Sequence, residues 1–579
     1  MAIAKRVPYG VSNFKKIIKF NQYYVDKTIY IPMLEDQPDY LIFIRPRRFG
    51  KSLFLSMLET YYDCNLKNQF KELFGELWIG SHPTPLQGEF QVLTLDFSQV
   101  GGDIEHLEEN FNSYCGFCFD SFMRRYKEYY GEKVAEQVYA ETQSHNKLAI
   151  IQKNAAEKGY PLYLIIDEYD NFTNTVLNEL GEEVYHAMTH ASGFYRDYFK
   201  KFKGSFDKIF MMGVSPVTLD DVTSGFNIGW NISTKPEFDK MLGFSTEDVR
   251  EMFTKYREAE KIPADSDVEA MIEEIKPWYD NYCFAEEEYG KTTMYNSVMV
   301  LNFLDKYIRN NYDIPKNMVE SNVRIDYDKV RMLIRHDKEF THDASIIQQL
   351  VTQGFVTGKL VENFPAERIN DPDNFLSLLF YFGMVTIDGT YDGSTKFIIP
   401  NEVVRDQMYT YLLDTYKEND LTYDSYNKGK LEAQLAYHGN YKAYFEFIAD
   451  SLKRYSSQRD KQKGEAFVHG FTLAMTSQNQ FYRPISELDN DGGYADIFLS
   501  PLCDIYKDMV DSYIIELKYS KTNTADEQLQ VLFKEASAQI CRYANSDIVK
   551  ESVKTTKLHK LVVIYRGTEM VMCEELTEE

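Results

Sequence analysis

Residues 41 to 62 have the layout of a phosphate-binding loop between a buried strand and a helix. The apolar run Leu41–Ile44 leads into Arg-Pro-Arg-Arg-Phe-Gly-Lys-Ser at 45–52, and helical periodicity without a breaker continues to residue 62. Such loops usually follow the spacing glycine, four residues, then Gly-Lys-Ser/Thr. Because they need a buried strand before them and a helix after them, this stretch predicts a parallel sheet covered by helices.

Arg45 stands where the first glycine of that spacing is expected. Glycines let backbone N–H groups curl around a phosphate without Cβ clashes. Three arginines in the loop instead add positive charge and forked hydrogen-bond donors. The loop is therefore either a specialised nucleotide-binding loop or a basic turn that only looks like one. The side chain of Arg45 either binds phosphate or faces away and braces the loop.

Further short apolar runs at 90–97, 163–166 and 209–214 alternate with helical segments, as a parallel α/β sheet requires. The second run ends in Asp167-Glu168. In P-loop enzymes an Asp at this strand tip holds Mg²⁺, and an adjacent Glu can polarise the attacking water. A solvated acidic turn would look the same. Ser215 follows the run 209–214 and is a candidate γ-phosphate or water sensor, although polar strand ends are common.

The composition favours a soluble cytoplasmic protein. Lys+Arg 64 against Asp+Glu 89 gives a net charge of −25, which opposes nonspecific nucleic-acid binding by the whole molecule but allows a local basic groove. The start of the chain lacks the apolar core of a secretory signal, and no uncharged apolar run approaches the ~18 residues of a membrane span. Seven scattered cysteines indicate reduced thiols, and the lone Cys115-x-x-Cys118 fits packing better than zinc or redox chemistry.

The middle of the chain is mostly helical. Segments 246–261 and 267–278 are predicted helices, and the apolar helix at 375–382 leads into a glycine-punctuated hairpin that ends near residue 399. A helix followed by such a hairpin suggests a small winged-helix-like module, which fits a packing lid better than a DNA-binding element.

The last part of the chain returns to α/β character, with strands expected at 495–499, 513–517 and 560–565. Asp496 opens the first of them, and Glu516 and Lys518 lie two apart on the second, hence on one face. Two carboxylates and a lysine on adjacent strands can hold a divalent cation and position a hydrolytic water. An exposed Glu-x-Lys is also often a plain surface ion pair.

Several motifs together resemble the bacterial AAA-ATPase-like family whose members often carry a C-terminal PD-(D/E)XK nuclease-like domain. They stand in this order: Val25-Asp26-Lys27-Thr28, the loop at 45–52, Leu95-Asp96-Phe97-Ser98, Ile166-Asp167-Glu168-Tyr169-Asp170, Gly213-Val214-Ser215, Trp278-Tyr279-Asp280-Asn281-Tyr282 and Met294-Tyr295-Asn296. The resemblance implies ATP binding, and in that family an arginine in place of the first glycine is usual. It assigns no role to Asp26 or Lys27.

The same resemblance covers the C-terminal carboxylates. Asp496 followed by Glu516-x-Lys518 matches the metal-dependent phosphodiester-cleaving core of PD-(D/E)XK nucleases. It implies that Glu465 is the helix carboxylate of such a core and that Gln539 is a group near substrate or metal. Glu487 also follows the pattern, while His469, four residues after Glu465, fits a supporting histidine better than a site residue.

The expected fold is α/β: an AAA-like P-loop ATPase core at 1–240, a helical lid at 241–350, a winged-helix-like connector at 351–450 and a PD-(D/E)XK restriction-endonuclease-like domain at 451–579. Expected nucleotide ligands are Arg45, Arg47, Arg48, Phe49, Gly50, Lys51, Ser52, Asp167 and Ser215. Expected catalytic residues are Glu168, Glu465, Asp496, Glu516, Lys518 and Gln539. Expected Mg²⁺ ligands are Ser52, Asp167, Asp496 and Glu516.

The leading hypothesis is an ATPase whose nucleotide state gates a metal-dependent nuclease, with ATP and Mg²⁺ as cofactors. Nucleic acid, with DNA favoured, is the expected partner of the C-terminal domain, where nine lysines and arginines supply local positive charge. No membrane partner is expected, and a homo-oligomer is possible. The alternative is a nucleotide-switched binding module whose nuclease-fold domain does not cut.

Overall fold

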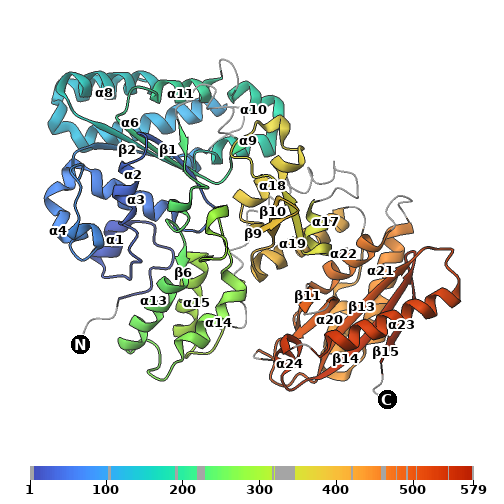
Figure 1. The fold of residues 1–579 in the computed structure, drawn as a ribbon. Coiled ribbons are helices and arrows are strands. Elements are labelled where there is room, and N and C mark those ends of the chain that lie inside the picture. Colours follow the sequence, from blue (N-terminus) through green and yellow to red (C-terminus); the bar gives the residue numbers. More distant parts are fainter. Residues whose placement is uncertain are drawn as a thin grey trace. The chain divides into compact units, whose positions relative to one another are not determined.

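The structure is a computed structural model of residues 1–579. It describes the chain apart from 1–4, 102–105, 190–192, 218–228, 316–317, 320–345, 419–420, 458–463, 478, 491–492, 504, 546 and 577–579. The chain forms two compact units (Figure 1). Unit 1 comprises Met1–Met332 with Thr357–Asn401, and unit 2 comprises Leu333–Val356 with Glu402–Glu579. These units differ from the expected boundaries at 240, 350 and 450, because helices after residue 402 share a core with the C-terminal strands.

A parallel sheet forms the centre of unit 1. Its five described strands have the order β2-β3-β4-β1-β5, and each neighbouring pair runs parallel. The bounds are β1 Tyr40–Ile44, β2 Gln91–Asp96, β3 Leu162–Asp167, β4 Lys208–Gly213 and β5 Trp230–Asn231. The apolar runs predicted as strands therefore form β1 to β4. Their side chains are almost wholly buried, as expected for strands covered on both faces.

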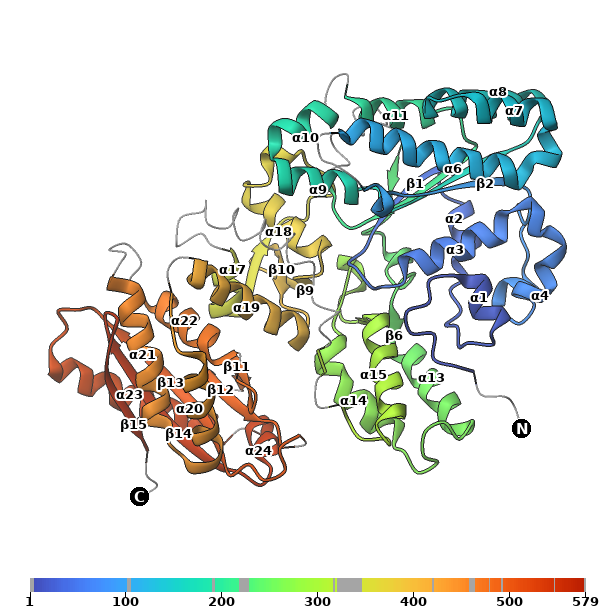
Figure 2. The same cartoon turned by 180° about the vertical axis from the view of Figure 1, so that it is seen from behind.

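Helices cover both faces of this sheet. α6 (Leu107–Tyr130), α8 (Ser144–Lys158) and α11 (Phe194–Phe202) lie on one face, and α2 (Tyr30–Glu35) and α3 (Lys51–Tyr62) lie on the other (Figures 1 and 2). The other helices of this part are α1 Phe14–Lys19, α4 Phe70–Phe74, α5 Trp78–Ser81, α7 Glu132–Ala140, α9 Asn171–Leu180 and α10 Glu182–Thr189. On α6, Cys115 is buried in the core and Cys118 is half-buried.

The remainder of unit 1 holds the expected helical lid and the helix–hairpin module. The lid consists of α13 (Thr246–Glu258), α14 (Val268–Tyr279), α15 (Ser297–Arg309) and the short strands β6 (Phe244–Ser245) and β7 (Met294–Tyr295). The module consists of α18 (Pro372–Tyr381) and the antiparallel strands β9 (Thr386–Tyr391) and β10 (Ser394–Ile398). Strand β8 (Phe355–Gly358) crosses the division between the units.

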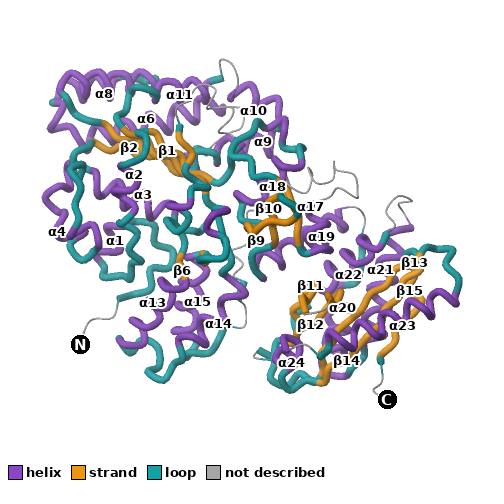
Figure 3. Tube along the Cα trace, viewed as in Figure 1, coloured by secondary structure: helices purple, strands orange, loops and turns teal. Residues whose placement is uncertain are grey.

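A mixed sheet of order β11-β12-β13-β14-β15 forms the centre of unit 2, and Figure 3 marks its strands in orange. The bounds are β11 Tyr482–Asn490, β12 Gly493–Pro501, β13 Asp511–Ser520, β14 Lys557–Arg566 and β15 Glu569–Glu575. β13 and β14 run parallel, and the other neighbouring pairs run antiparallel. The three predicted strands are β12, β13 and β14.

Two strands at the edges of this sheet were not predicted. β11 holds Pro484, and β15 carries three glutamates, so neither shows the composition of a strand. The charged sequence Glu574-Glu-Leu-Thr-Glu-Glu predicts a frayed, solvated end, and this prediction is wrong for the residues described. Glu574 and Glu575 belong to β15, and the amide of Leu576 donates to the carbonyl of Lys560. Pairing with the buried strand β14 overrides the weak local preference.

Helices cover both faces of this sheet as well. α19 (Glu402–Glu418), α20 (Ser425–His438), α21 (Tyr441–Ser457) and α22 (Glu465–Ser477) share one core with Ile515 and Leu517 of β13. On the opposite face, Ile540 and Tyr543 of α23 (Asp526–Tyr543) pack against Ile514. The other described helices of unit 2 are α17 Ile346–Gln353 and α24 Asp547–Val553. Among the helices that the structure describes, none is both long and apolar enough to cross a bilayer.

Candidate functional site

The loop at 45–50 turns directly from the end of β1 into the first turn of α3. Gly50 caps the helix with a φ of 94°, a left-handed conformation that suits glycine. Arg48 also has a positive φ, of 71°. These two left-handed residues, on either side of Phe49, turn the chain sharply into the N-terminus of α3. That arrangement is a ready site for an anion.

The structure brings Lys51, Ser52, Asp167 and Glu168 together at the carboxyl ends of β1 and β3. The ammonium of Lys51 is buried and donates to the main-chain carbonyls of Arg45 and Pro46, each at 3.1 Å. It also lies 3.8 Å from Oε1 of Glu168. The hydroxyl of Ser52 donates to Oδ2 of Asp167 at 2.5 Å. These are the four side chains to which the sequence assigned phosphate, metal and water.

The pKa of Asp167 is raised to about 6, chiefly by burial and also by the charges of Glu168 and Asp96, while Ser52 and Lys51 oppose the shift. Asp96 is the register partner of Asp167 on the neighbouring strand β2. Sequence reasoning gave Asp96 no role. The sequence did contain a signal for it: Asp96 ends a second buried strand. Because parallel strands end at the same edge of a sheet, that position predicts a carboxylate close to Asp167. A cation at this edge would relieve the crowding of negative charge.

Asp170 ties the turn after β3 to the end of β4. It is completely buried and accepts from the amides of Val214 and Ser215 and from the side chain of Asn174. A Cβ at Gly213 would lie 2.4 Å from Oδ1 of Asp170, so only glycine fits there. The hydroxyl of Ser215 accepts from the amide of Val217. The structure thus places Ser215 beside the site, engaged in its own turn.

Arg45 points away from the phosphate side of the loop. Its guanidinium is 1% exposed and donates to the carbonyls of Ser233, at 2.6 Å, and Phe238, at 3.1 Å. The same group lies 4.2 Å from the ring centre of Phe43 and 4.1 Å from that of Phe284. Burial lowers its pKa to about 10, and Asp239 opposes the shift. The sequence left two roles open for Arg45, binding phosphate or bracing the loop, and this geometry fits the second.

The other loop residues are held by their backbones. The carbonyl of Arg47 accepts from the side chain of Asn296, and the carbonyl of Arg48 accepts from the hydroxyl of Ser297. The amide of Gly243 donates to the carbonyl of Phe49. The start of α15 and the turn before β6 therefore fix the loop from outside. The side chains of Arg47 and Arg48 are half-buried, while the Phe49 ring is buried.

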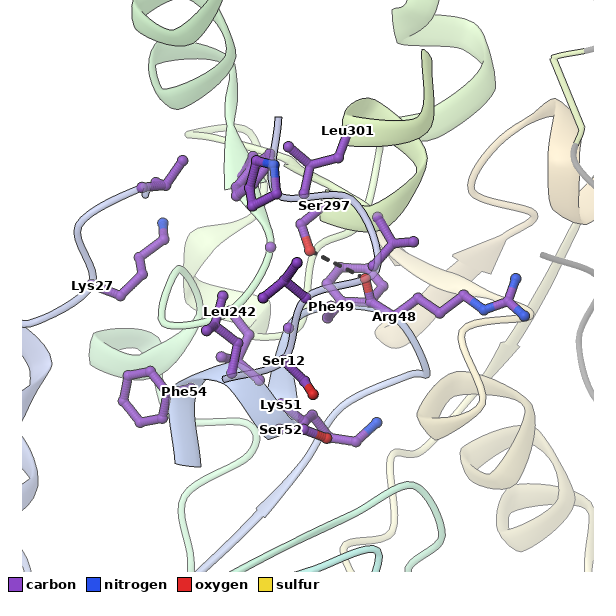
Figure 4. Close-up of a pocket in the computed structure, with 18 of the residues that line it drawn as sticks. Ser12, Lys27, Arg48, Phe49, Lys51, Ser52, Phe54, Leu242, Ser297 and Leu301 are labelled. Atoms are coloured by element: carbon purple, nitrogen blue, oxygen red, sulfur yellow. Dashed lines mark hydrogen bonds between the residues drawn. The ribbon is translucent and has the colours of Figure 1, made fainter. Parts of the chain in front are cut away.

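A pocket of about 360 Å³ opens beside the loop and the start of α3 (Figure 4). Its walls also include apolar groups of the N-terminal segment and the lid: Pro8, Val11, Met241, Leu242 and Leu301. Lys27 lies on one side of it, whereas the guanidinium of Arg48 extends away from Lys27 and Leu242. The ammonium of Lys27 donates to Oδ2 of Asp248 at 2.8 Å. Asp248 closes the capping box of α13, so Lys27 joins the pocket wall to the lid.

Asp26 likewise has a structural position. Its carboxylate accepts from the amide and hydroxyl of Thr28 and, through the second oxygen, from the amide of Trp78 at 2.6 Å. It therefore fixes the turn that presents Lys27 to the pocket. The sequence motif contained both residues, and only their long-range partners reveal what they do.

In unit 2, strand register brings Asp496 and Glu516 together. Ile497 of β12 pairs with Ile515 of the antiparallel strand β13. Asp496 precedes Ile497 and Glu516 follows Ile515, so these two residues come opposite each other. Oδ2 of Asp496 accepts from the amide of Leu517 at 2.7 Å. The ammonium of Lys518 donates to Oε1 of Glu516 at 2.8 Å. The expected trio is thus assembled on the face that α23 covers.

Burial, together with the charge of Asp496, raises the pKa of Glu516 to about 7. Among the described residues, Oε2 of Glu516 has no hydrogen-bond partner, and neither has Oε1 of Gln539. Glu465 is exposed at the start of α22 and acts electrostatically on Lys518. His469 contacts the main-chain oxygen of Asp496 at 3.1 Å. The side chain of Glu487 lies outside the described residues.

The donor set fits a divalent cation in part. A buried carboxylate oxygen without a donor, beside a second carboxylate, is what a cation would satisfy. The described residues contain no group of three His, Cys, Asp or Glu side chains that could hold a metal ion. Asp496 and Glu516 would therefore supply two ligands, and water or substrate oxygens would complete the coordination.

We expect Arg45→Ala to lower the stability of unit 1 by about 3 kcal/mol or more, because it leaves Asp239 buried without its cation and two carbonyls without donors. Arg47→Ala in the same loop is the matched control and should cost far less. Differential scanning calorimetry of the full chain measures both. Equal losses would contradict the bracing role of Arg45.

The raised pKa of Glu516 predicts a pH dependence of stability. Between the ordinary value of 4.5 and about 7, the folded state binds the proton more tightly than the unfolded state, so the free energy of unfolding falls as pH rises. The thermal midpoint should therefore drop less between pH 5 and pH 8 in Glu516→Gln than in the unsubstituted protein. Glu551→Gln, an exposed glutamate of α24, should follow the unsubstituted protein. Parallel curves for all three would refute the shift.

Comparison with known proteins assigns separate family models to the N-terminal and C-terminal parts of the chain. Residues 8–223 match the family model described as "Predicted AAA-ATPase", and residues 463–575 match the model of the PD-(D/E)XK nuclease superfamily. An uncharacterised protein in the vnfD 5′ region of Azotobacter chroococcum mcd 1 is 26% identical over 299 residues. That match covers 49% of each chain, so this chain spans about half the length of its curated relative.

Two solved structures are distantly similar. The Aeropyrum pernix ORC2 protein (ADPNP–ADP complexes) has a TM-score of 0.30 and 12% identity, covering 67% of this chain and 93% of its own. The Aeropyrum pernix ORC1 protein in complex with DNA has a TM-score of 0.26 and 9% identity, covering 71% and 96%. Similarities this low carry no argument about function. From the family models and the two sheets, the chain carries an AAA-ATPase-like domain at its N-terminal end and a PD-(D/E)XK nuclease-superfamily domain in its C-terminal part.

Proposed function

We propose that unit 1 binds and hydrolyses ATP and that its nucleotide state controls a metal-dependent nuclease activity of unit 2. The observation that carries the first half is the meeting of Lys51, Ser52, Asp167 and Glu168 beside a pocket. A structural ion pair would not need a hydroxyl, two carboxylates and a helix N-terminus around one lysine. Phosphate chemistry uses all of them.

Each side chain has a role in this proposal. Lys51 exchanges its two carbonyl partners for the β- and γ-phosphates, where its charge is better compensated. Ser52 and Asp167 would hold Mg²⁺, which supplies positive charge to the phosphate oxygens. Glu168 lies within reach of Lys51 and is the group that would orient the attacking water. Asp96 stands beside Asp167 and adds negative charge for the cation.

The apolar part of the pocket suits the nucleoside. Pro8, Val11, Leu242 and Leu301 line it with hydrocarbon, against which the flat apolar faces of a base could pack. The wall is built from both the N-terminal segment and the lid. Binding of the base would therefore draw these two parts of unit 1 together, with the Lys27–Asp248 ion pair already joining them.

The second half of the proposal rests on the trio in unit 2. Asp496 and Glu516 would hold a divalent cation, which supplies a Lewis acid beside the scissile phosphate. Lys518 is partly exposed, with a raised pKa, so it stays charged and can position the water or the phosphate. Gln539 presents an unpartnered buried oxygen on the neighbouring helix. DNA is the favoured substrate.

One observation favours a second candidate, a nucleotide-switched module that binds nucleic acid without cutting. Lys518 already neutralises Oε1 of Glu516, and the described residues supply two carboxylates here rather than three. A nuclease fold with this arrangement could serve as a binding surface. Cleavage assays separate the two candidates.

For the nucleotide site, we expect Lys51→Ala to weaken ATP binding by about tenfold or more, since it removes the buried cation from the loop. Glu168→Gln should retain binding and slow hydrolysis by roughly 10² or more. Isothermal titration and phosphate release measure the two effects. Lys153→Ala, an exposed lysine of α8, is the control and should match the unsubstituted protein. Unchanged affinity in Lys51→Ala would argue against the site.

For the C-terminal site, we expect the full chain to cut linear DNA with Mg²⁺ or Mn²⁺, at a rate that changes when ATP is added. Glu516→Gln and Lys518→Ala should abolish cutting, because they remove a cation ligand and the positioning charge. Glu551→Gln should cut normally. Cutting that survives in Glu516→Gln would exclude this site, whereas DNA binding without cutting would support the non-cleaving module.

A further inference from the structure

The phosphate loop is held from behind by one short segment of unit 1, residues 280–284. The ring of Phe49 meets the rings of Tyr282 and Phe284 edge-on, with centroids 5.0 and 5.5 Å apart. Phe284 also lies under the guanidinium of Arg45. The proposed phosphate-binding loop thus packs against two aromatic rings, those of Tyr282 and Phe284.

The helix–hairpin module is in close contact with the same loop. Gly383 follows α18 with a φ of +75°, and a Cβ built there would lie 2.8 Å from Cβ of Pro46. Only a glycine at this position allows the close approach. Arg45 and Pro46 therefore touch Phe284 and the turn at Gly383, respectively. Their carbonyls are also the two acceptors of the Lys51 ammonium.

Segment 280–284 is fixed in turn to the start and the end of the hairpin. The amide of Cys283 donates to the hydroxyl of Thr386 at 2.8 Å. The side chain of Asn401 donates to the carbonyl of Asp280 at 2.9 Å, in a buried position. Burial raises the pKa of Tyr282 to about 12, and a hydrogen bond with Asn401 opposes that shift. Asn401 therefore holds the start and the middle of the segment that contacts the loop.

Asn401 is the last residue of unit 1, and α19 begins at the next residue, Glu402. No linker separates them. Further along α19, Tyr409 and Leu413 belong to the core of unit 2 that includes Ile515 and Leu517, the residues on either side of Glu516. Asn401 is thus followed at once by a helix that shares a hydrophobic core with the strand of the candidate nuclease site.

We propose that Asn401 and Thr386 are positioning residues that transmit the state of the phosphate loop to α19. When a phosphate binds the Lys51 ammonium, the carbonyls of Arg45 and Pro46 lose their hydrogen-bond donor. The loop then readjusts at its contacts with Phe284 and Gly383. Packed aromatic and glycine contacts of this kind shift between discrete arrangements rather than deform smoothly. The inference rests on the proposed nucleotide site and adds the route of its control over unit 2.

The test is hydrogen–deuterium exchange of the full chain with and without ATPγS and Mg²⁺. In the unsubstituted protein we expect slower exchange at 45–54 and, in addition, altered exchange at 280–284 and 402–418. In Asn401→Ala, ATPγS affinity should stay within about threefold, because the substitution lies away from the pocket. Protection at 45–54 should remain, while the change at 402–418 should fall to about a third or less.

Two further variants keep the test decisive. Asn65→Ala removes an amide that donates to the carbonyl of Arg125 elsewhere in unit 1, and it should behave like the unsubstituted protein. Thr386→Val keeps the side-chain volume and removes the acceptor of the Cys283 amide, so it should uncouple α19 as Asn401→Ala does. A full response at 402–418 in both variants, or protection of the loop alone in the unsubstituted protein, would overturn the route. Absence of ATPγS binding would overturn the nucleotide site itself.

Discussion

A buried guanidinium sets the position of the phosphate loop. Arg45 is removed from water, and its desolvation is offset by two main-chain carbonyls, two aromatic faces and the charge of Asp239. A shift of the loop at its first residue would therefore also move the groups in contact with this guanidinium. The positive charge that the structure places at the start of α3 is that of Lys51, and Arg45 stiffens the loop.

The sequence predicted the loop, the acidic strand end and the positions of four strands, because each depends on local patterns: a buried run, a glycine and a helix start. It could not choose the direction of the Arg45 side chain. That choice depends on Ser233, Phe238 and Phe284, which lie about 190 to 240 residues away along the chain. The same holds for Lys27, whose partner Asp248 no local pattern could identify.

In unit 2 the alternation of a strand was enough to put Glu516 and Lys518 on one face, and register then added Asp496. The strands β11 and β15 escaped prediction because their partners, rather than their own residues, hold them in the sheet. The sharing of a core between α19 and the C-terminal sheet was equally invisible, since helical periodicity says which face is apolar and not what covers it.

The direct junction between Asn401 and α19 has a geometric consequence. A flexible linker would absorb a small rotation of the backbone, whereas a helix carries it along its length as a lever. α19 has 17 residues, which at 1.5 Å per residue makes an arm of about 25 Å. A tilt of about 5° at its first turn displaces the far end by about 2 Å, more than half the length of a hydrogen bond. By the route proposed above, a small readjustment of the backbone at Asn401 would therefore become a displacement of about that size at the far end of α19.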